Sequence, residues 1–414
     1  NRGDGADLSR APGADGDRKT FTFSTWFKLG QTPYDGSSLD YDIFSANSTN
    51  NFNDNFRLRS DGQIQIQAIV SGSSNNGYNF RSTMLFRDPS AWYHLVVGID
   101  TTQSTNSDGV KVYVNGSLIS GTYHAYNQDI STSFNKSGST MALGHTENDG
   151  GNHYDGYISE TNFIDGTQLD ASYFGETNDN GVWIPKKYTG SYGTNGFFLE
   201  YQQTGTSQNS SGIGADTSGN DNHFAVTNLA ATDITTDVPT NNFATLNPAN
   251  KYASPLVTEG NLEYDSNSSS GSSMVSTIAP SNGKWYCEVK LLTSTLTVGV
   301  AEVGKTNFDK IGGGASRPQI DYTYGGDVNI DGSDVDDEAT YTTNDIIGIL
   351  LNLDDNEVIF QKNGASINSG TAYNLHTNTT QENTGFYVQT HTGSGNTKAS
   401  FNFGNPAFAI SSGN

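Results

Sequence analysis

Short runs in which apolar and polar residues alternate recur along the first half of the chain. Residues 21–27 read FTFSTWF and residues 63–69 read QIQIQAI. A period of two places successive side chains on opposite faces of a strand. Residues 110–114, VKVYV, run directly into Asn115-Gly116, which is a hairpin-turn signal. Together with the apolar run 92–99, WYHLVVGI, these patterns predict a β-sandwich over residues 20–200.

A second set of alternating runs follows a stretch that is poor in strand signals. The runs lie at 283–292, 296–303, 344–364 and 385–404. The length of 414 residues fits two domains of about 200 residues each. We therefore predict a first sandwich at 1–204, a connector rich in Asn, Thr and Asp at 205–256 that packs on the domains, and a second sandwich at 257–414.

Composition supports this all-β fold class. Hydrophobic residues make up 33% of the chain, but 21 Tyr, 21 Phe and 4 Trp can fill thin sandwich cores. The 47 Gly and many Asn, Ser and Asp favour tight turns over helices. Of the four tryptophans, Trp26, Trp92 and Trp285 lie within strand patterns and are predicted to be core residues. The single cysteine, Cys287, precludes an internal disulfide and is predicted to be a small core residue.

Charge limits the classes of partner. The net charge of −23 repels nucleic-acid phosphates and anionic membranes, so neither is expected as a partner. No apolar run approaches the roughly 18 residues needed to span a bilayer, so membrane insertion is not expected. An acidic surface keeps a protein soluble and also suits divalent cations.

The first half resembles a laminin-G-like domain of the concanavalin A-like lectin superfamily. The resemblance lies in the order and spacing of FTFSTWFKLG, WYHLVVGID, VKVYVNGSLI, MALGH and YDGYISETNFIDGTQL, and it covers roughly residues 5–200. The segment 214–224, GADTSGNDNHF, resembles one that usually opens such domains, although here it follows the domain. Two interpretations stay open: residues 195–224 pack back onto the sandwich as late strands, or they form a connector.

The second half resembles a SPRY (B30.2) domain. The landmarks are GKWYCEV, NDIIGILLNLD, FQKNG and FNFG, in this order. The segments GVWIPKKYTGSYGTNGFFLEY and DVPTNNFATLNP resemble stretches of structural proteins of tailed, particularly marine, bacteriophages. The full resemblance implies two jelly-roll sandwiches, a concanavalin A-like one followed by a SPRY-like one.

These resemblances imply a non-enzymatic protein on the virion surface, such as a tail fibre, an appendage or a capsid decoration protein. The expected partners are other virion proteins and host-surface carbohydrate, bound through the loops at the ends of the sandwiches. A homotrimer is one expected assembly because phage appendages are commonly trimers. Two alternatives stay open. One is a purely architectural virion protein, and the other is a polysaccharide-degrading tail enzyme.

One aromatic group outside the strand patterns is a candidate glycan-binding site. Trp183 is followed by Tyr188 and Tyr192, and aromatic faces stack on the apolar faces of sugar rings. The favoured alternative is a rigid clasp that joins the two domains, because Pro185 and these rings suit the packing of a connector.

Two acidic segments are candidate calcium sites. Asp327, Asn329, Asp331, Gly332 and Glu338 match the pattern D-x-[DN]-x-[DN]-G-x5-E, in which alternate oxygen ligands surround a tight turn. The flanks read as strands rather than helices, so a chance match in a surface loop is the competing interpretation. Asp149 and Asp155 form a second candidate, because laminin-G-like domains often bind Ca²⁺ at an acidic rim. The nearby His145 and His153 are interpreted as solvated.

Enzyme motifs are absent from the sequence. The E-x-D-x-x-E string of retaining glycosidases with this fold does not occur, and residues 158–165, ISETNFID, lack its spacing. There is no G-x-S-x-G, H-E-x-x-H or Walker loop. We therefore expect no catalytic residues, although carboxylates far apart in sequence leave the depolymerase alternative open.

Overall fold

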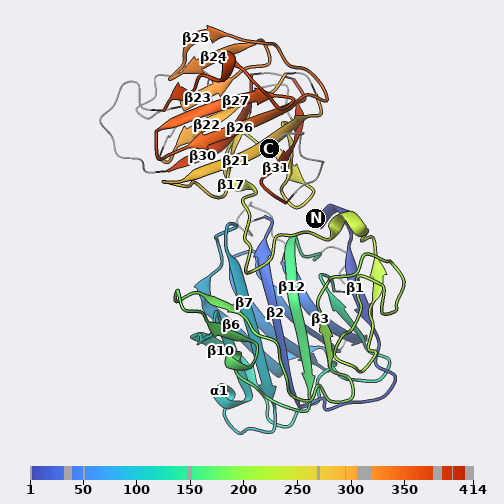
Figure 1. The fold of residues 1–414 in the computed structure, drawn as a ribbon. Coiled ribbons are helices and arrows are strands. Elements are labelled where there is room, and N and C mark those ends of the chain that lie inside the picture. The colour runs from blue at the N-terminus through green and yellow to red at the C-terminus, as the bar shows by residue number, and fades with distance from the viewer. Residues whose placement is uncertain are drawn as a thin grey trace. The chain divides into compact units, whose positions relative to one another are not determined.

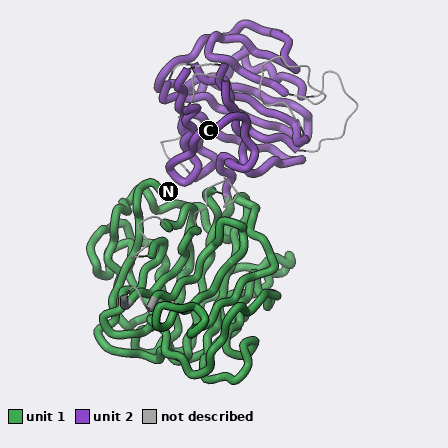
Figure 2. Tube along the Cα trace, turned by 180° about the vertical axis from the view of Figure 1, so that it is seen from behind, with its two compact units in different colours: residues 1–242 green, residues 243–414 purple. Residues whose placement is uncertain are grey.

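The chain folds into two compact units, residues 1–242 and 243–414 (Figures 1 and 2). The computed structural model describes residues 2–31, 40–49, 52–146, 152–267, 271–293, 295–304, 319–375, 385–393 and 395–405. The division differs from the predicted boundaries. Residues 205–242 belong to the first unit and residues 243–256 to the second, so the predicted connector is divided between them.

Unit 1 contains two antiparallel sheets. Among the described residues, the larger sheet has eight strands, in the order β10 (Gly121–Tyr126), β6 (Ser73–Leu85), β5 (Gln63–Val70), β4 (Phe52–Leu58), β3 (Tyr41–Thr49), β11 (Thr140–Leu143), β1 (Asp7–Arg10) and β16 (Ala225–Thr227). The smaller sheet has six, in the order β15 (Phe197–Leu199), β12 (Gly156–Asp165), β2 (Thr20–Leu29), β7 (Trp92–Asp100), β8 (Val110–Val114) and β9 (Ser117–Leu118). This arrangement confirms the predicted sandwich.

Aromatic rings fill the space between these sheets. Phe23 of β2 stacks on Phe44 of β3 with ring centroids 4.5 Å apart, and each ring comes from a different sheet. Phe134 also stacks on Phe44, at 4.8 Å. All three side chains are fully buried. Large rings thus replace the aliphatic residues that the composition lacks.

Residues 195–227 add one late strand to an edge of each sheet. β15 pairs with β12, and β16 pairs with β1. The carboxylate of Asp216 fixes the segment, because it accepts the backbone N–H groups of Phe198 and Asn222 at 2.8 Å each. Of the two interpretations of this segment, the structure has the one in which it packs back onto the sandwich.

Helices are few and short among the described residues. They are η1 (Arg2–Asp4), α1 (Asn106–Gly109), η2 (Ala171–Tyr173), η3 (Ala231–Asp233) and η4 (Asn368–Gly370), and a separate small ribbon pairs β13 (Gly175–Thr177) with β14 (Trp183–Pro185). The predicted all-β class is confirmed. None of the helices in the described ranges has the length and apolar character to cross a membrane.

Unit 2 is also built from two antiparallel sheets. Among the described residues, the first has the order β17 (Leu246–Tyr252), β20 (Ser272–Ser276), β30 (Phe386–Thr392), β22 (Thr297–Glu302), β23 (Gln319–Tyr322), β24 (Asp327–Ile330) and β25 (Ser333–Asp337). The second has the order β18 (Leu256–Thr258), β19 (Glu263–Asp265), β31 (Lys398–Asn402), β21 (Lys284–Leu291), β26 (Ile346–Asn352), β27 (Glu357–Lys362) and β28 (Ala365–Ser366), with β29 (Tyr373–Asn374) also paired to β27.

The core of unit 2 is more aliphatic and includes the single cysteine. Cys287 of β21 is buried, and burial together with the nearby Glu288 raises the pKa of its thiol to about 12. It is therefore a core residue, as predicted. The prediction for Trp285 is wrong: its side chain is 52% exposed, and its indole Nε1 donates to the carbonyl of Asn282. Trp26 and Trp92 are buried, as predicted.

Candidate functional site

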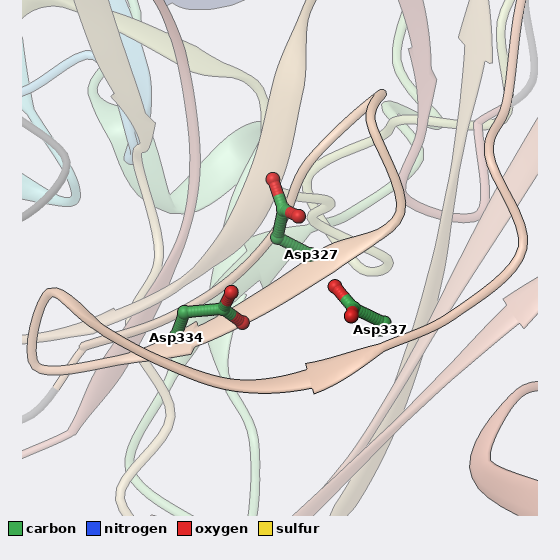
Figure 3. A group of neighbouring side chains, drawn as sticks. All are labelled: Asp327, Asp334 and Asp337. Atoms are coloured by element: carbon green, nitrogen blue, oxygen red, sulfur yellow. The ribbon is translucent and has the colours of Figure 1, made fainter.

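The segment that matches the calcium pattern forms a β-hairpin, here called the acidic hairpin (residues 327–337). In its register, Asp327 of β24 pairs with Asp337 of β25, and Asn329 pairs with Asp334. Directly paired residues, and residues two apart on a strand, share one face of a sheet. These four side chains therefore lie on the same face. One oxygen from each of the three carboxylates lies within 4.8 Å of the others (Figure 3).

Asp331 and Gly332, the next residues of the sequence pattern, form the turn of the hairpin. Asp331 and Gly332 have φ of +51° and +81°, the left-handed conformation that both central residues of a type I′ hairpin turn adopt. The Asp331 carboxylate accepts the backbone N–H of Gln319 at 2.9 Å. Strand geometry thus explains the Asp-Gly pair without an ion.

Glu338, the last residue of the pattern, belongs to the opposite side of the hairpin. Its charge acts on the phenols of Tyr322 and Tyr373, whose pKa values are raised mainly by burial. The structure therefore brings together Asp327 and Asn329 but separates them from Glu338. Asp334 and Asp337, which the linear pattern does not include, take the positions beside them. Strand alternation on both sides of Asp331-Gly332 could have identified Asp334. It would have paired Asp327 with Asp336 instead of Asp337, because the sequence does not reveal the register shift between Val328 and Asn329.

The second predicted acidic site is only partly described. Asp149 lies outside the described residues. Asp155 is buried directly before β12, and its carbonyl accepts the N–H of Gly30 at 3.0 Å. The rings of His145 and His153 stack with centroids 4.3 Å apart. Parallel stacking does not aim two ring nitrogens at one metal ion. The role predicted for Asp149 and Asp155 stays a prediction.

The three aromatic residues proposed for glycan binding pack into a small second core of unit 1. Tyr188 stacks on Phe174 at 5.3 Å and meets Tyr192 edge-on at 5.1 Å. Trp183 and Tyr192 are half-buried against the same cluster, which covers the outer face of the six-stranded sheet. These contacts give the rings a packing role within unit 1. Glycan binding by them stays a prediction.

A buried histidine anchors Trp183 to that sheet. The indole Nε1 of Trp183 donates to His94 Nδ1 at 3.0 Å, and His94 Nε2 lies 2.9 Å from Ser24 Oγ. Because Nδ1 must accept, the proton sits on Nε2 and His94 donates to Ser24. This tautomer cannot act as a base toward that serine. Burial lowers the pKa of His94 to about 3, so the ring is neutral.

The outer face of the eight-stranded sheet carries polar side chains in ordered rows. Seven residues of β3, β4, β5 and β6 point away from the core, on the other side of the sheet from Phe44, Phe56, Ile66 and Phe80. We call them the polar sheet face: Ser45, Asn55, Arg57, Gln65, Gln67, Asn79 and Arg81. The alternation in residues 63–67 predicts Gln65 and Gln67 on one face. Sequence patterns alone do not predict that β3, β4 and β6 align further polar residues with them.

Hydrogen bonds order this face. Arg57 donates to Asn55 Oδ1, Gln67 Oε1 and Asp40 Oδ2 at 3.0–3.1 Å. Gln65 Nε2 donates to Asn79 Oδ1 at 2.9 Å. The amides are almost completely covered, whereas the two arginine side chains are partly exposed. The guanidinium groups thus form the accessible layer over a fixed layer of amides.

Arg81 differs from Arg57 in its partners. Its buried Nε donates to no acceptor among the described residues. The neighbouring charges are mixed, since Arg57, Arg59, Asp40 and Asp61 all act on it. A partly exposed guanidinium that forms no ion pair among the described residues can bind oxygen-rich ligands.

One glutamate has the properties expected of a functional acid. Glu160 has φ of +51° at a bulge of β12, where the register to β2 shifts between Ser159 and Asn162. Burial, and then the charge of Glu200, raises the pKa of its carboxyl group. Strained backbone and a perturbed acid are both frequent at functional sites.

Comparisons with known proteins bear on the fold. A family model described as the concanavalin A-like lectin/glucanases superfamily matches residues 2–172. Similar solved structures include the SPRY domain of human HERC1, with 15% identity, 40% of this chain and 99% of that chain covered, and a TM-score of 0.33. Another human SPRY domain has 18% identity, 38% and 98% coverage and a TM-score of 0.30.

A heptameric SAP-like pentraxin from Limulus polyphemus has 19% identity, 40% and 71% coverage and a TM-score of 0.29. A comparison with curated proteins found no match. The family match confirms the predicted laminin-G-like domain: residues 2–172, within unit 1, are similar to the concanavalin A-like lectin/glucanases superfamily.

Proposed function

We propose that the chain is a non-catalytic binding protein on a virion surface and that unit 1 binds host-surface carbohydrate. In this proposal the protein is a tail fibre, an appendage or a capsid decoration protein, and it also contacts other virion proteins. The resemblance of its segments to phage structural proteins supports the virion assignment. The absence of enzyme motifs from the sequence supports a binding role.

The main support for carbohydrate binding by unit 1 is the polar sheet face. It presents two partly exposed guanidinium groups above a layer of covered amides, on adjacent strands of a rigid sheet. Sugar hydroxyls are both donors and acceptors, so a ligand site needs donors and acceptors at fixed spacing. Side chains held by their neighbours lose little conformational entropy on binding. The face therefore fits an oligosaccharide better than an apolar peptide.

Arg81 is the side chain of this face best placed to contact ligand. It is partly exposed and forms no ion pair or side-chain hydrogen bond among the described residues, whereas Arg57 is already bound to Asp40 and two amides. The test is binding of the full chain to a panel of purified bacterial surface polysaccharides that includes neutral, uronate-containing and sulfated polymers. We expect at least one polymer to bind and Arg81→Ala to weaken that binding by roughly tenfold or more.

Arg87→Ala is the matched control, because Arg87 is an exposed arginine that follows β6 outside the polar sheet face. It should leave the affinity unchanged. Equal losses for the two variants would indicate a non-specific charge effect and contradict the proposal. Equal affinity of Arg81→Ala and the unchanged protein would also contradict it.

The virion assignment has a separate test. Cryo-electron microscopy of the particle that carries this chain would locate it. Sparse copies at a tail tip or spike end fit receptor binding. Copies spread over the capsid or along a shaft fit the architectural alternative, in which both units only build the particle.

The polysaccharide-degrading alternative is favoured by one specific observation, the strained and half-buried Glu160 with Glu200 nearby. A carboxyl group with a raised pKa can act as a general acid. If the chain is a depolymerase, Glu160→Gln abolishes release of reducing ends from the bound polymer without weakening binding. If it is only a binding protein, neither the unchanged protein nor the variant releases them.

A further inference from the structure

We propose that the acidic hairpin of unit 2 binds a calcium ion through Asp327, Asn329, Asp334 and Asp337. This ligand set differs from the linear sequence pattern, since it omits Asp331 and Glu338. The proposal does not depend on carbohydrate binding by unit 1.

The first support is the approach of three carboxylates. Their nearest oxygens lie within 4.8 Å of one another, and Asp334 and Asp337 are exposed, so an ion can reach them. No lysine, arginine or histidine forms an ion pair with any of the three among the described residues. Like charges at this spacing repel each other, and a divalent cation between them removes that repulsion.

The second support is Asn329. Its side chain is only 8% exposed, yet its amide forms no side-chain hydrogen bond among the described residues. In the register it pairs with Asp334 and lies two residues from Asp327, on the same face. Buried polar groups nearly always have a partner. The amide of Asn329 has none among the described residues, and its oxygen is available to a cation held by the neighbouring carboxylates.

The donor set identifies the class of ion. All four groups offer oxygen, which hard cations prefer, whereas zinc and copper sites use nitrogen or sulfur. Calcium accepts six to eight oxygens at irregular angles, and Mg²⁺ requires a near-ideal octahedron. β25 lies at the edge of its sheet, so solvent can complete the coordination. An irregular set of this kind on a hairpin fits Ca²⁺.

The experiment is isothermal titration of CaCl₂ into the full chain after treatment with a chelator. We expect one saturable site with a Kd on the order of 0.1–1 mM, the range of extracellular calcium modules, and weaker binding of MgCl₂. Asp334→Asn and Asp337→Asn should each lower the calcium affinity by roughly tenfold, because the charge of the ligands sets the affinity. Both positions are exposed, so the variants should fold, and circular dichroism checks this.

Two controls separate this site from the alternatives. Glu338→Gln should leave the affinity unchanged, because Glu338 lies on the other side of the hairpin; a loss as large as that of Asp334→Asn would favour the linear pattern and overturn the proposal. Asp179→Asn removes an exposed acid in a turn of unit 1 and should also have no effect. Absence of saturable binding up to ~10 mM CaCl₂, or unchanged binding by Asp334→Asn and Asp337→Asn, would overturn it as well.

Discussion

Lys28 Nζ lies 2.7 Å from Asp237 Oδ2 in unit 1, and neither side chain is exposed. The other carboxylate oxygen of Asp237 accepts the indole N–H of Trp92 at 2.9 Å. Asn242 Oδ1 accepts a further hydrogen bond from Lys28 at 2.8 Å. These bonds fasten the last residues of unit 1 to β2 and β7, so residues 237–242 are part of the sandwich.

Removing one member of this pair should destabilise unit 1. Asp237→Ala leaves the Lys28 ammonium buried without its counter-ion, and we expect a loss of about 3–5 kcal/mol. Denaturant unfolding measures this loss. The matched control is Lys19→Ala, which breaks the exposed pair with Asp129 and should cost less than about 1 kcal/mol. Similar losses in the two variants would mean that the buried pair has no special role.

His94 should make unit 1 less stable in acid. Burial lowers the pKa of His94 in the folded state from 6.5 to about 3. Between these values the unfolded chain binds the extra proton, so the stability is complete above pH 6.5 and falls as the pH decreases toward 3. At pH 5 the free energy of unfolding is lower by about 2 kcal/mol than it is well above pH 6.5, as far as His94 is concerned. His94→Phe lowers the free energy of unfolding at every pH, but it should also remove the part of the pH dependence that comes from His94. The free energy of unfolding, measured at pH 7 and pH 5, should therefore fall less in the variant than in the unchanged protein. An equal fall in both would contradict a lowered pKa of His94.

Asp54 should have the opposite pH dependence. Its side chain is buried in β4, where burial raises the pKa of its carboxyl group from 3.8 to about 7. Between pH 3.8 and pH 7 the folded state binds one more proton at Asp54 than the unfolded state does. The free energy of unfolding therefore falls as the pH rises through this range. Asp54→Asn should gain stability relative to the unchanged protein by about 3–4 kcal/mol between pH 4 and pH 8. Unfolding curves at the two pH values test this, and a pH-independent difference would refute it.

Replacing Trp183 should lower the stability of unit 1 and should not act on polysaccharide binding alone. Its ring packs closely on Gly116 and Gly175, and its N–H is bound to His94. We expect Trp183→Ala to lower the free energy of unfolding by about 2–3 kcal/mol, less than for a fully buried ring. Val182→Ala changes the exposed neighbour and should have little effect. Unchanged stability with weaker polysaccharide binding would instead support a glycan platform.

The sequence predicts the strands better than the sites. Period-two alternation and Asn115-Gly116 identify the sandwich of unit 1, because each strand buries one face. The calcium pattern at 327–338 is ambiguous at Asp331-Gly332, since this pair has the same signature for a type I′ turn as for an ion loop. The partners of Asp327 depend on strand register, which a linear pattern does not contain. Arg57 and Arg81 likewise come together only through the pairing of β4, β5 and β6.

Carbohydrate binding without cleavage can be measured in one assay. Polysaccharide is retained on the immobilised full chain, and the length of the retained polymer is then determined. We predict that the polymer identified in the panel is retained, that it is released with its original length, and that Arg81→Ala retains much less of it than Arg87→Ala. A shortened polymer would contradict a non-catalytic role. Failure to retain any polymer, or equal retention by the two variants, would contradict carbohydrate binding by the polar sheet face.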